Sequence, residues 1–288
     1  MMIDGYGRKI EELRISVTQE CNLDCAYCHR EGEVNPGRQM ATEEIIILAR
    51  HFAEAGVRRV KITGGEPLLR EDIVGIVNGI SELEGIDEVS MTTNGLLLAG
   101  KARAVREAGL KRVNIGCDSM SSPLLLKNAS TIREGLKAAK LAGLEPIKLN
   151  MVVLRGINEH EIPEMMEFAR SQGVILQLIE LINTDADFYT RHYYPLEGVE
   201  ESLKSRATLI VERRSKSRMQ YYLDDLIVEV VRPNCREFCV DCNKIRLTSD
   251  GRIKPCLRIF GGHIPVGGDF TRSLEKALDS RVIGCDGR

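Results

Sequence analysis

The chain has 288 residues, and its 40 Lys and Arg against 42 Asp and Glu give a net charge of −2. With no overall cationic field, no Trp and 5% aromatic residues, we expect no nucleic-acid partner. No apolar run approaches the roughly 20 residues of a membrane-spanning helix. The N-terminus resembles neither a signal peptide nor a transit peptide, so we expect a cytoplasmic protein with no membrane partner.

Short β-prone segments alternate with longer segments of helical period from residue 13 to about residue 182. The predicted strands are 13–18, 59–63, 88–93, 112–118, 146–154 and 174–181. The predicted helices, each ending on a glycine that can take the left-handed C-terminal conformation, are 43–56, 72–85, 99–109, 131–143 and 161–173. This alternation predicts an α/β fold of parallel strands with right-handed crossovers.

Six such strands are too few for a closed eight-stranded barrel, so we favour a partial (β/α)6 barrel; the pattern leaves a doubly wound sheet open. The alternation of strands and helices ends after about residue 185, and the aromatic stretch 187–198 that follows is predicted to be irregular. Further β-prone segments are 207–214, 218–223 and 225–231. We therefore predict a barrel of residues 1–220 and a smaller C-terminal region of residues 221–288, stabilised by a metal centre.

Cys21, Cys25 and Cys28 follow the first predicted strand, at the edge of the sheet where enzymes of this class place their sites. A cytosolic compartment disfavours disulfides and favours metal binding or catalysis. Three thiolates on one loop can hold a [4Fe–4S] cluster and leave one iron without a protein ligand. The alternative is a structural zinc site, for which His29 would have to supply a fourth ligand.

Cys239, Cys242 and Cys256 form a second set of three near the C-terminus, again without a nearby His. A zinc site with Cys235 as fourth ligand is the alternative here, and Cys285 is a more distant candidate. Cys117 lies in a predicted buried strand and is interpreted as a small core residue.

The first cysteine loop together with KITGGEPLLR at 61–70 resembles the radical S-adenosylmethionine (SAM) superfamily. MTTNG at 91–95, KLNMVV at 148–153 and the second cysteine set with its NKIR run at 243–246 occur in the same order in the MoaA (GTP 3′,8-cyclase) family of molybdenum cofactor biosynthesis. CHREGE at 28–33 resembles the archaeal branch of that family. The resemblance covers residues 3 to about 260.

The resemblance implies a partial barrel with two [4Fe–4S] clusters and SAM as cofactors. In the family, the first cluster reduces SAM to methionine and a 5′-deoxyadenosyl radical. That radical takes the 3′ hydrogen of GTP, and the resulting carbon radical attacks C8 of guanine, with no side chain acting as acid or base. The second cluster binds the purine. GTP is the implied substrate, an electron donor of unknown identity is an implied partner, and a homodimer is left open.

The resemblance also assigns residues. SAM would contact Tyr27, Gly64, Gly65 and Glu66. Glycines after a strand let a ligand approach the backbone closely because they have no Cβ, which is an independent reason to expect the glycine pair at a ligand site. GTP would contact Arg14, Lys61, Thr92, Lys148, Lys244 and Arg246. A triphosphate carries about four negative charges and needs several converging cations, and cations on strands that face a barrel interior are costly without a partner.

Three positions depart from the family pattern. Gly116 stands before Cys117 where the family has Ser, so a hydroxyl contact to SAM is missing, and Ile182 replaces a Met near the adenine. The sequence ends in IGCDGR where the family has a Gly-Gly tail. The alternatives are another radical SAM enzyme with an auxiliary cluster, acting on a peptide or other small molecule, and a zinc-stabilised binding protein. About eight irons per chain would indicate two clusters, and zinc without sulfide the last alternative.

Overall fold

The computed structural model describes residues 2–33, 38–121, 125, 127–212, 218–233, 236–259 and 261–283. Six parallel strands lie side by side in chain order at the middle of one large sheet. They are β3 (Glu12–Ser16), β4 (Arg59–Thr63), β5 (Glu88–Thr93), β6 (Arg112–Gly116), β7 (Lys148–Val153) and β8 (Ile175–Glu180). All six predicted strands are therefore confirmed.

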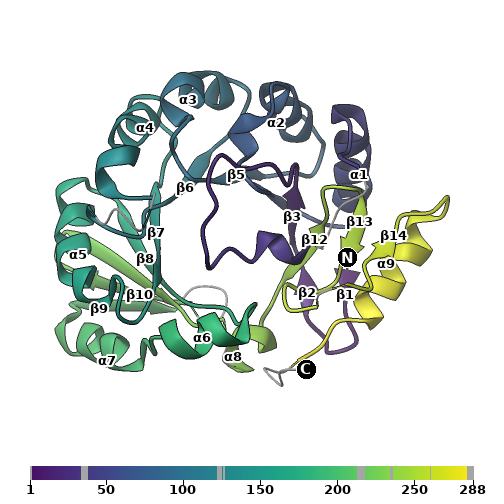
Figure 1. Ribbon diagram of the computed structural model, residues 1–288. Coiled ribbons are helices and arrows are strands. Elements are labelled where there is room, and N and C mark those ends of the chain that lie inside the picture. Colours follow the sequence, from purple (N-terminus) through teal and green to yellow (C-terminus); the bar gives the residue numbers. More distant parts are fainter. Residues whose placement is uncertain are drawn as a thin grey trace.

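Five helices cover the outside of the curved sheet and leave its inner face open (Figure 1). They are α1 (Thr42–Glu54), α2 (Ile73–Ser81), α3 (Leu98–Glu107), α4 (Ala129–Leu141) and α5 (Ile162–Ser171). Gly56, which follows α1, has a φ of 112°, and Gly109, which follows α3, has a φ of 106°, as the predicted helix ends require. The helices are confirmed, and their place on one face favours the partial barrel over a doubly wound sheet.

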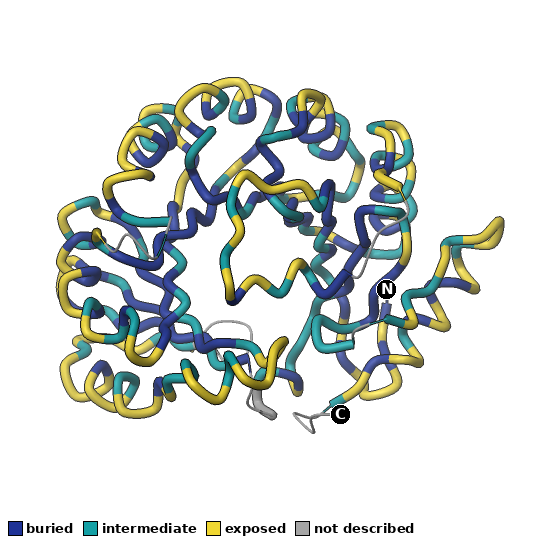
Figure 2. The backbone as a smooth tube through the Cα atoms, in the orientation of Figure 1, coloured by how far each residue is buried: buried dark blue, intermediate teal, exposed yellow. Residues whose placement is uncertain are grey.

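The strands alternate between two environments, because successive side chains point to opposite faces of a sheet. On β3, Leu13 and Ile15 are fully buried in the core against the helices, whereas Arg14 between them faces the interior of the ring. Figure 2 shows the buried strands inside a ring of helices with exposed outer surfaces. Barrel interiors are usually filled by branched apolar residues, so a polar interior marks a site for a ligand.

The C-terminal region extends the sheet at both edges. At one edge β12 (Lys244–Leu247) pairs in parallel with β3 and is followed by β13 (Arg252–Lys254) and β14 (Ile264–Pro265). At the other, β11 (Leu226–Val231) pairs in parallel with β8 and is followed by β10 (Arg218–Leu223) and β9 (Leu209–Glu212). The boundary between residues 1–220 and 221–288 stays a prediction; residue 220 lies within β10.

The remaining elements surround this frame. β1 (Met2–Ile3) and β2 (Lys9–Ile10) form a short hairpin, α8 (Arg236–Val240) precedes β12, and α9 (Phe270–Asp279) packs against β13 and β14. Single turns of helix are η1 (Arg30–Gly32), η2 (Pro67–Leu69) and η3 (Glu159–Glu161). None of the described helices has the length and apolarity that a membrane crossing requires.

The prediction of an irregular stretch at 187–198 was wrong. α6 (Ala186–His192) and α7 (Glu197–Arg206) lie there. Asp185 caps α6, because its Oδ1 accepts a hydrogen bond from the backbone N–H of Phe188 at 2.8 Å. Aromatic residues are weak helix formers, so they gave no helix signal, although the capping residue Asp185 stands just before them.

Candidate active site

The first cysteine loop runs from β3 across the mouth of the ring (Figure 1). Cys21, Cys25 and Cys28 all line a cavity of about 240 Å³, which we call the first cavity. Cys21 and Cys28 are exposed and Cys25 is half-buried, and the cysteines in the described part of the chain are all free of disulfides. The three thiols are thus brought together on one surface, as the spacing predicts.

Gly64 and Gly65 line the same cavity and press against the cysteine loop. A Cβ at Gly64 would lie 2.4 Å from the Thr18 carbonyl oxygen, and one at Gly65 would lie 2.1 Å from that of Glu20. Glu66 is fully buried and does not line the cavity. Its carboxylate accepts hydrogen bonds from the Leu68 N–H, the Thr93 hydroxyl and the Asn94 N–H at 2.6–3.0 Å, so it holds the glycine turn against β5.

Tyr27 belongs to a buried polar group at the wall of the first cavity. Its hydroxyl donates to the Asp118 carboxylate, which Lys127 also contacts at 2.9 Å. The Lys127 ammonium lies 4.9 Å from the centre of the Tyr27 ring. Burial, and then the charge of Asp118, hold the pKa of Tyr27 well above its usual value, so the phenol stays protonated. Asp118 and Lys127 were missed from the sequence.

Lys127 also lies against Gly116. A Cβ at Gly116 would lie 2.8 Å from Cδ of Lys127, and both residues line the first cavity. A larger side chain at position 116 would therefore have to displace the flexible lysine side chain.

A second cavity of about 230 Å³ lies within the ring. It is lined by all six residues predicted to contact GTP and also by Cys239, Cys242 and Cys256. The two cavities share six wall residues, which are His29, Glu31, Thr92, Asn150, Ile179 and Ile182. The structure thus places the two cysteine sets on adjoining cavities, and Ile182 lies at the shared wall.

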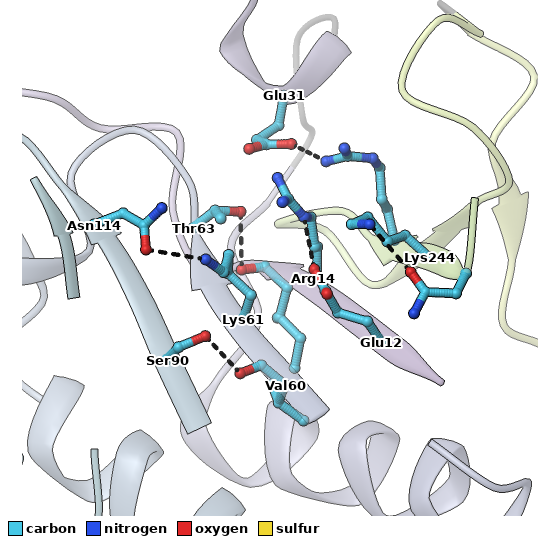
Figure 3. A network of polar contacts seen from close by, with 12 residues as sticks. Glu12, Arg14, Glu31, Val60, Lys61, Thr63, Ser90, Asn114 and Lys244 are labelled. Carbon is cyan, nitrogen blue, oxygen red and sulfur yellow. Dashed lines mark hydrogen bonds and ion pairs between the residues drawn. The ribbon is translucent and has the colours of Figure 1, made fainter. Parts of the chain in front are cut away.

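Four cations stand side by side on neighbouring strands. Lys254 lies opposite Arg246, Arg246 opposite Arg14, and Arg14 opposite Lys61; we call these four the cation row. Like charges in direct cross-strand register are destabilising unless anions neutralise them. Glu12 contacts Arg14 at 3.2 Å and Glu31 pairs with Arg246, while Lys61 donates to the amide oxygen of Asn114 at 3.3 Å (Figure 3).

Lys61 and Lys148 differ in their partners, since Lys61 contacts an amide oxygen and Lys148 contacts a carboxylate. Burial, and then the charges of Arg112 and Arg14, hold the pKa of Lys61 well below its usual value, which an added anion would reverse. Lys148 lies 2.5 Å from the carboxylate of Glu229, a fully buried residue of β11. Glu229 thus holds Lys148 in place from the added edge of the sheet. Lys244, the remaining predicted cation, donates to the Asn243 side chain at 3.1 Å.

Two buried arginines hold the second cysteine set. Arg8 donates to the Cys239 carbonyl at 2.7 Å, and Arg281 donates to the Cys242 carbonyl at 2.8 Å. Arg281 also donates to the carbonyl of Pro255, next to Cys256, at 2.8 Å. Asp4 bridges both guanidinium groups at 2.7 Å each. Residues from the two ends of the chain therefore position the backbone beside all three cysteines.

The chemistry of the second cysteine set fits a cluster. Burial raises the pKa of Cys242, but the charges of Lys244 and Arg281 outweigh it and bring the value to about 7, which favours the thiolate that binds iron. A cluster spreads its ligands over several irons, so three cysteines on separate segments can hold one without converging on a single ion. Cys235 and Cys285 lie outside the described residues.

Comparison with known proteins agrees with this geometry. The model of the radical SAM superfamily matches residues 15–169, and that of Molybdenum Cofactor Synthesis C matches residues 174–266. A probable GTP 3′,8-cyclase of Methanocella arvoryzae is 42% identical over 98% of this chain and 92% of its own length. One of Archaeoglobus fulgidus is 40% identical over 98% of this chain and 97% of its own. The chain belongs to the GTP 3′,8-cyclase family.

Membership of this radical SAM family implies SAM and a [4Fe–4S] cluster as cofactors. Among solved structures, Streptococcus suis SuiB bound to S-adenosylmethionine superposes with a TM-score of 0.63 at 18% identity, over 93% of this chain and 64% of SuiB. That likeness confirms the radical SAM fold. The roles of the individual site residues stay predictions.

The sequence of this GTP 3′,8-cyclase family member does not indicate several residues of the site. Arg8 and Arg281 line the second cavity and Asp4 joins them, but all three lie near the chain ends, far from the cysteine and glycine motifs. Glu31 lies inside CHREGE, but nothing in that pattern indicated that its side chain reaches β12. Cys117, by contrast, is confirmed as a core residue: it is fully buried, its sulfur lies 3.9 Å from that of Met165, and burial raises its pKa to about 12.

Proposed function

We propose that this chain converts GTP to (8S)-3′,8-cyclo-7,8-dihydroguanosine 5′-triphosphate in molybdenum cofactor biosynthesis. The observation that carries the proposal is the second cavity, which combines the predicted phosphate-binding cations with three cysteines and adjoins the first cysteine loop. The names of relatives 40–43% identical favour this activity over a peptide-modifying radical SAM enzyme. A cytoplasmic location and an external electron donor belong to the same proposal.

Each cysteine set has a proposed occupant. Cys21, Cys25 and Cys28 would hold the first [4Fe–4S] cluster, with SAM against Tyr27 and the glycine turn. When bound there, SAM supplies the radical that removes a hydrogen from the substrate ribose. Cys239, Cys242 and Cys256 would hold a second [4Fe–4S] cluster, whose open iron would bind the guanine.

The protein's own side chains bind and orient the substrate. Arg14, Lys61 and Arg246 converge from three neighbouring strands, so they can hold a triphosphate in the second cavity. Cys239, Cys242 and Cys256 line the same cavity, where a second cluster would hold the base. A ribose held there would lie near the shared wall, next to Thr92 and Ile182. Binding both the phosphates and the base fixes where the ribose lies relative to the first cavity, and such positioning is a large part of what a protein contributes to a reaction.

Anaerobic incubation of reconstituted protein with SAM, reductant and GTP tests the proposal by mass spectrometry. We expect 5′-deoxyadenosine and a cyclised nucleotide that is an isomer of GTP, which chromatography must separate from GTP before its mass and fragments are measured. The Cys25→Ala protein serves as the control for background cleavage. Formation of 5′-deoxyadenosine with GTP left unchanged would refute the substrate but not the radical SAM assignment.

A further inference from the structure

Glu31 places a carboxylate inside the cation row. It belongs to the turn η1, lines both cavities and pairs with the Arg246 guanidinium. Lys254 reaches the same turn and donates to the carbonyl oxygen of Glu31 at 2.7 Å. Figure 3 shows the Glu31 carboxylate and Arg14 pointing into the same space between the strands and the turn. Glu31 therefore stands where a phosphate group would bind these cations.

The carboxylate is ionised at neutral pH. Burial alone would raise the pKa of Glu31, but the charges of Arg246, His29 and Arg14 lower it to about 2. A phosphate that binds Arg246 would have to share one guanidinium with this carboxylate. Two anions on one cation in a buried site repel each other strongly. Glu31 and a phosphate group therefore compete for Arg246.

The turn that carries Glu31 is strained. Arg30 has a φ of 46° and Glu31 a φ of 53°, in the left-handed region that side chains with a Cβ disfavour. The turn begins two residues after Cys28, so it connects the first cysteine loop directly to the cation row. The contacts from Arg246 of β12 and Lys254 of β13 hold the turn against the added edge of the sheet. Loss of the Arg246 contact would remove one of these two restraints on a strained turn.

We propose that the Glu31 carboxylate occupies the phosphate position on Arg246 when substrate is absent, and that the phosphates of the substrate displace it. The inference rests on the proposed function, because it requires the cation row to bind phosphate. A small anion that contacts only Arg246 would not compensate for the loss of the Glu31 contact, whereas a triphosphate can also contact Arg14 and Lys61, which line the same cavity. Displacement also frees the turn beside Cys28, so the wall shared with the first cavity changes only when a phosphorylated substrate is present.

Equilibrium dialysis of GTP and of guanosine against anaerobically reconstituted protein tests the competition. Glu31→Gln keeps the shape but removes the charge, so GTP should bind roughly tenfold more tightly and guanosine should bind as before. Glu12→Gln is the matched control, because Glu12 lines the same cavity and contacts Arg14 at 3.2 Å. It measures the general effect of removing one negative charge, and we expect a smaller gain.

Weaker GTP binding by Glu31→Gln would overturn the inference, because Glu31 would then orient Arg246 for the substrate. An equal gain in Glu12→Gln would overturn it too. Both results leave the proposed function intact if wild-type protein prefers GTP to guanosine. If wild-type protein binds the two equally, the phosphate role of the cation row fails and the inference about Glu31 fails with it.

Hydrogen exchange of the wild-type protein provides a second test that does not depend on a variant. In η1 the Gly32 N–H donates to the His29 carbonyl at 2.6 Å, and the Glu33 N–H donates to that of Arg30 at 3.1 Å. GTP should speed exchange of these two amides, and guanosine should not. Slower exchange with GTP would mean that phosphate tightens the turn, and would overturn the proposal.

Discussion

The two cysteine sets are held in different ways. Cys21, Cys25 and Cys28 lie on one continuous loop, which packs against the glycine turn that follows β4. Cys239 and Cys242 lie in and just after α8, whereas Cys256 follows β13, and arginines from both ends of the chain join these segments. The first site is thus a local structure on the barrel, and the second exists only when the complete chain has folded. This difference predicts that a substitution can remove the cluster at one site and leave the cluster at the other in place.

The largest effect should come from the first loop. Cys25→Ala should reduce 5′-deoxyadenosine formation to background, because a cluster that loses a thiolate ligand cannot deliver an electron to SAM. The variant with Cys239, Cys242 and Cys256 all replaced by Ala should still cleave SAM while making no cyclised product. Chromatography of the products from both variants makes the comparison. Undiminished cleavage by Cys25→Ala would reject the first-loop assignment.

Arg281→Met should affect only the second set. It removes one partner of a buried ion pair, which costs about 3–5 kcal/mol of stability, and it frees the carbonyls of Cys242 and Pro255. Iron per reconstituted chain should fall from about eight to about four, while SAM cleavage persists. Arg103→Met is the control, since its ion pair with Glu107 is exposed to solvent and should contribute little to stability. Full iron content in Arg281→Met would show that the guanidinium does not position the cysteines.

Lys254 of β13 donates to the carbonyl oxygen of Glu31 and so joins the C-terminal region to the first cysteine loop. Because this ammonium can lose its proton, the stability of the contact should depend on pH. Burial, and then the charge of Arg246, lower the pKa of Lys254 from 10.5 to about 8. Between these values the unfolded chain binds more protons than the folded one, so the free energy of unfolding should rise as pH increases from about 8 to 10.5, by at most about 3 kcal/mol.

Denaturant unfolding at several pH values checks this prediction, with Lys254→Met as the comparison. The variant should lose that part of the rise. A rise of the same size in Lys254→Met would assign the titration to another group.

The smallest of these effects concerns the substrate and tests whether the second site is more than a cysteine cluster. Lys244→Ala should weaken GTP binding about 10- to 100-fold, because a charge-assisted contact contributes roughly 1.5 to 3 kcal/mol. Guanosine has no phosphate and should bind as before. The loss should shrink as salt rises, although less than for a surface contact. Equilibrium dialysis at two salt concentrations measures this, and equal losses for both ligands would exclude a phosphate role for Lys244.

The sequence by itself determined the barrel and the first site. Strands such as 59–63 and 88–93 alternate with amphipathic helices that end on glycine, and this signal is local, so the elements could be placed without knowledge of their neighbours. Cys21, Cys25 and Cys28 are likewise local, because residues three and four apart on one loop cannot lie far from each other. The error at α6 is also local in origin, because the aromatic residues are weak helix formers, whereas Asp185 just before them caps a helix.

The tertiary structure alone decided how the second site is assembled. No sequence pattern indicates that Asp4 joins Arg8 to Arg281, that Glu229 neutralises Lys148, or that Lys127 takes the space above Gly116. These contacts join residues from 4 to 277 positions apart, and a buried charge can be paired from any segment that reaches it. Which segment does so depends on how the added strands β11 and β12 align with the edges of the barrel.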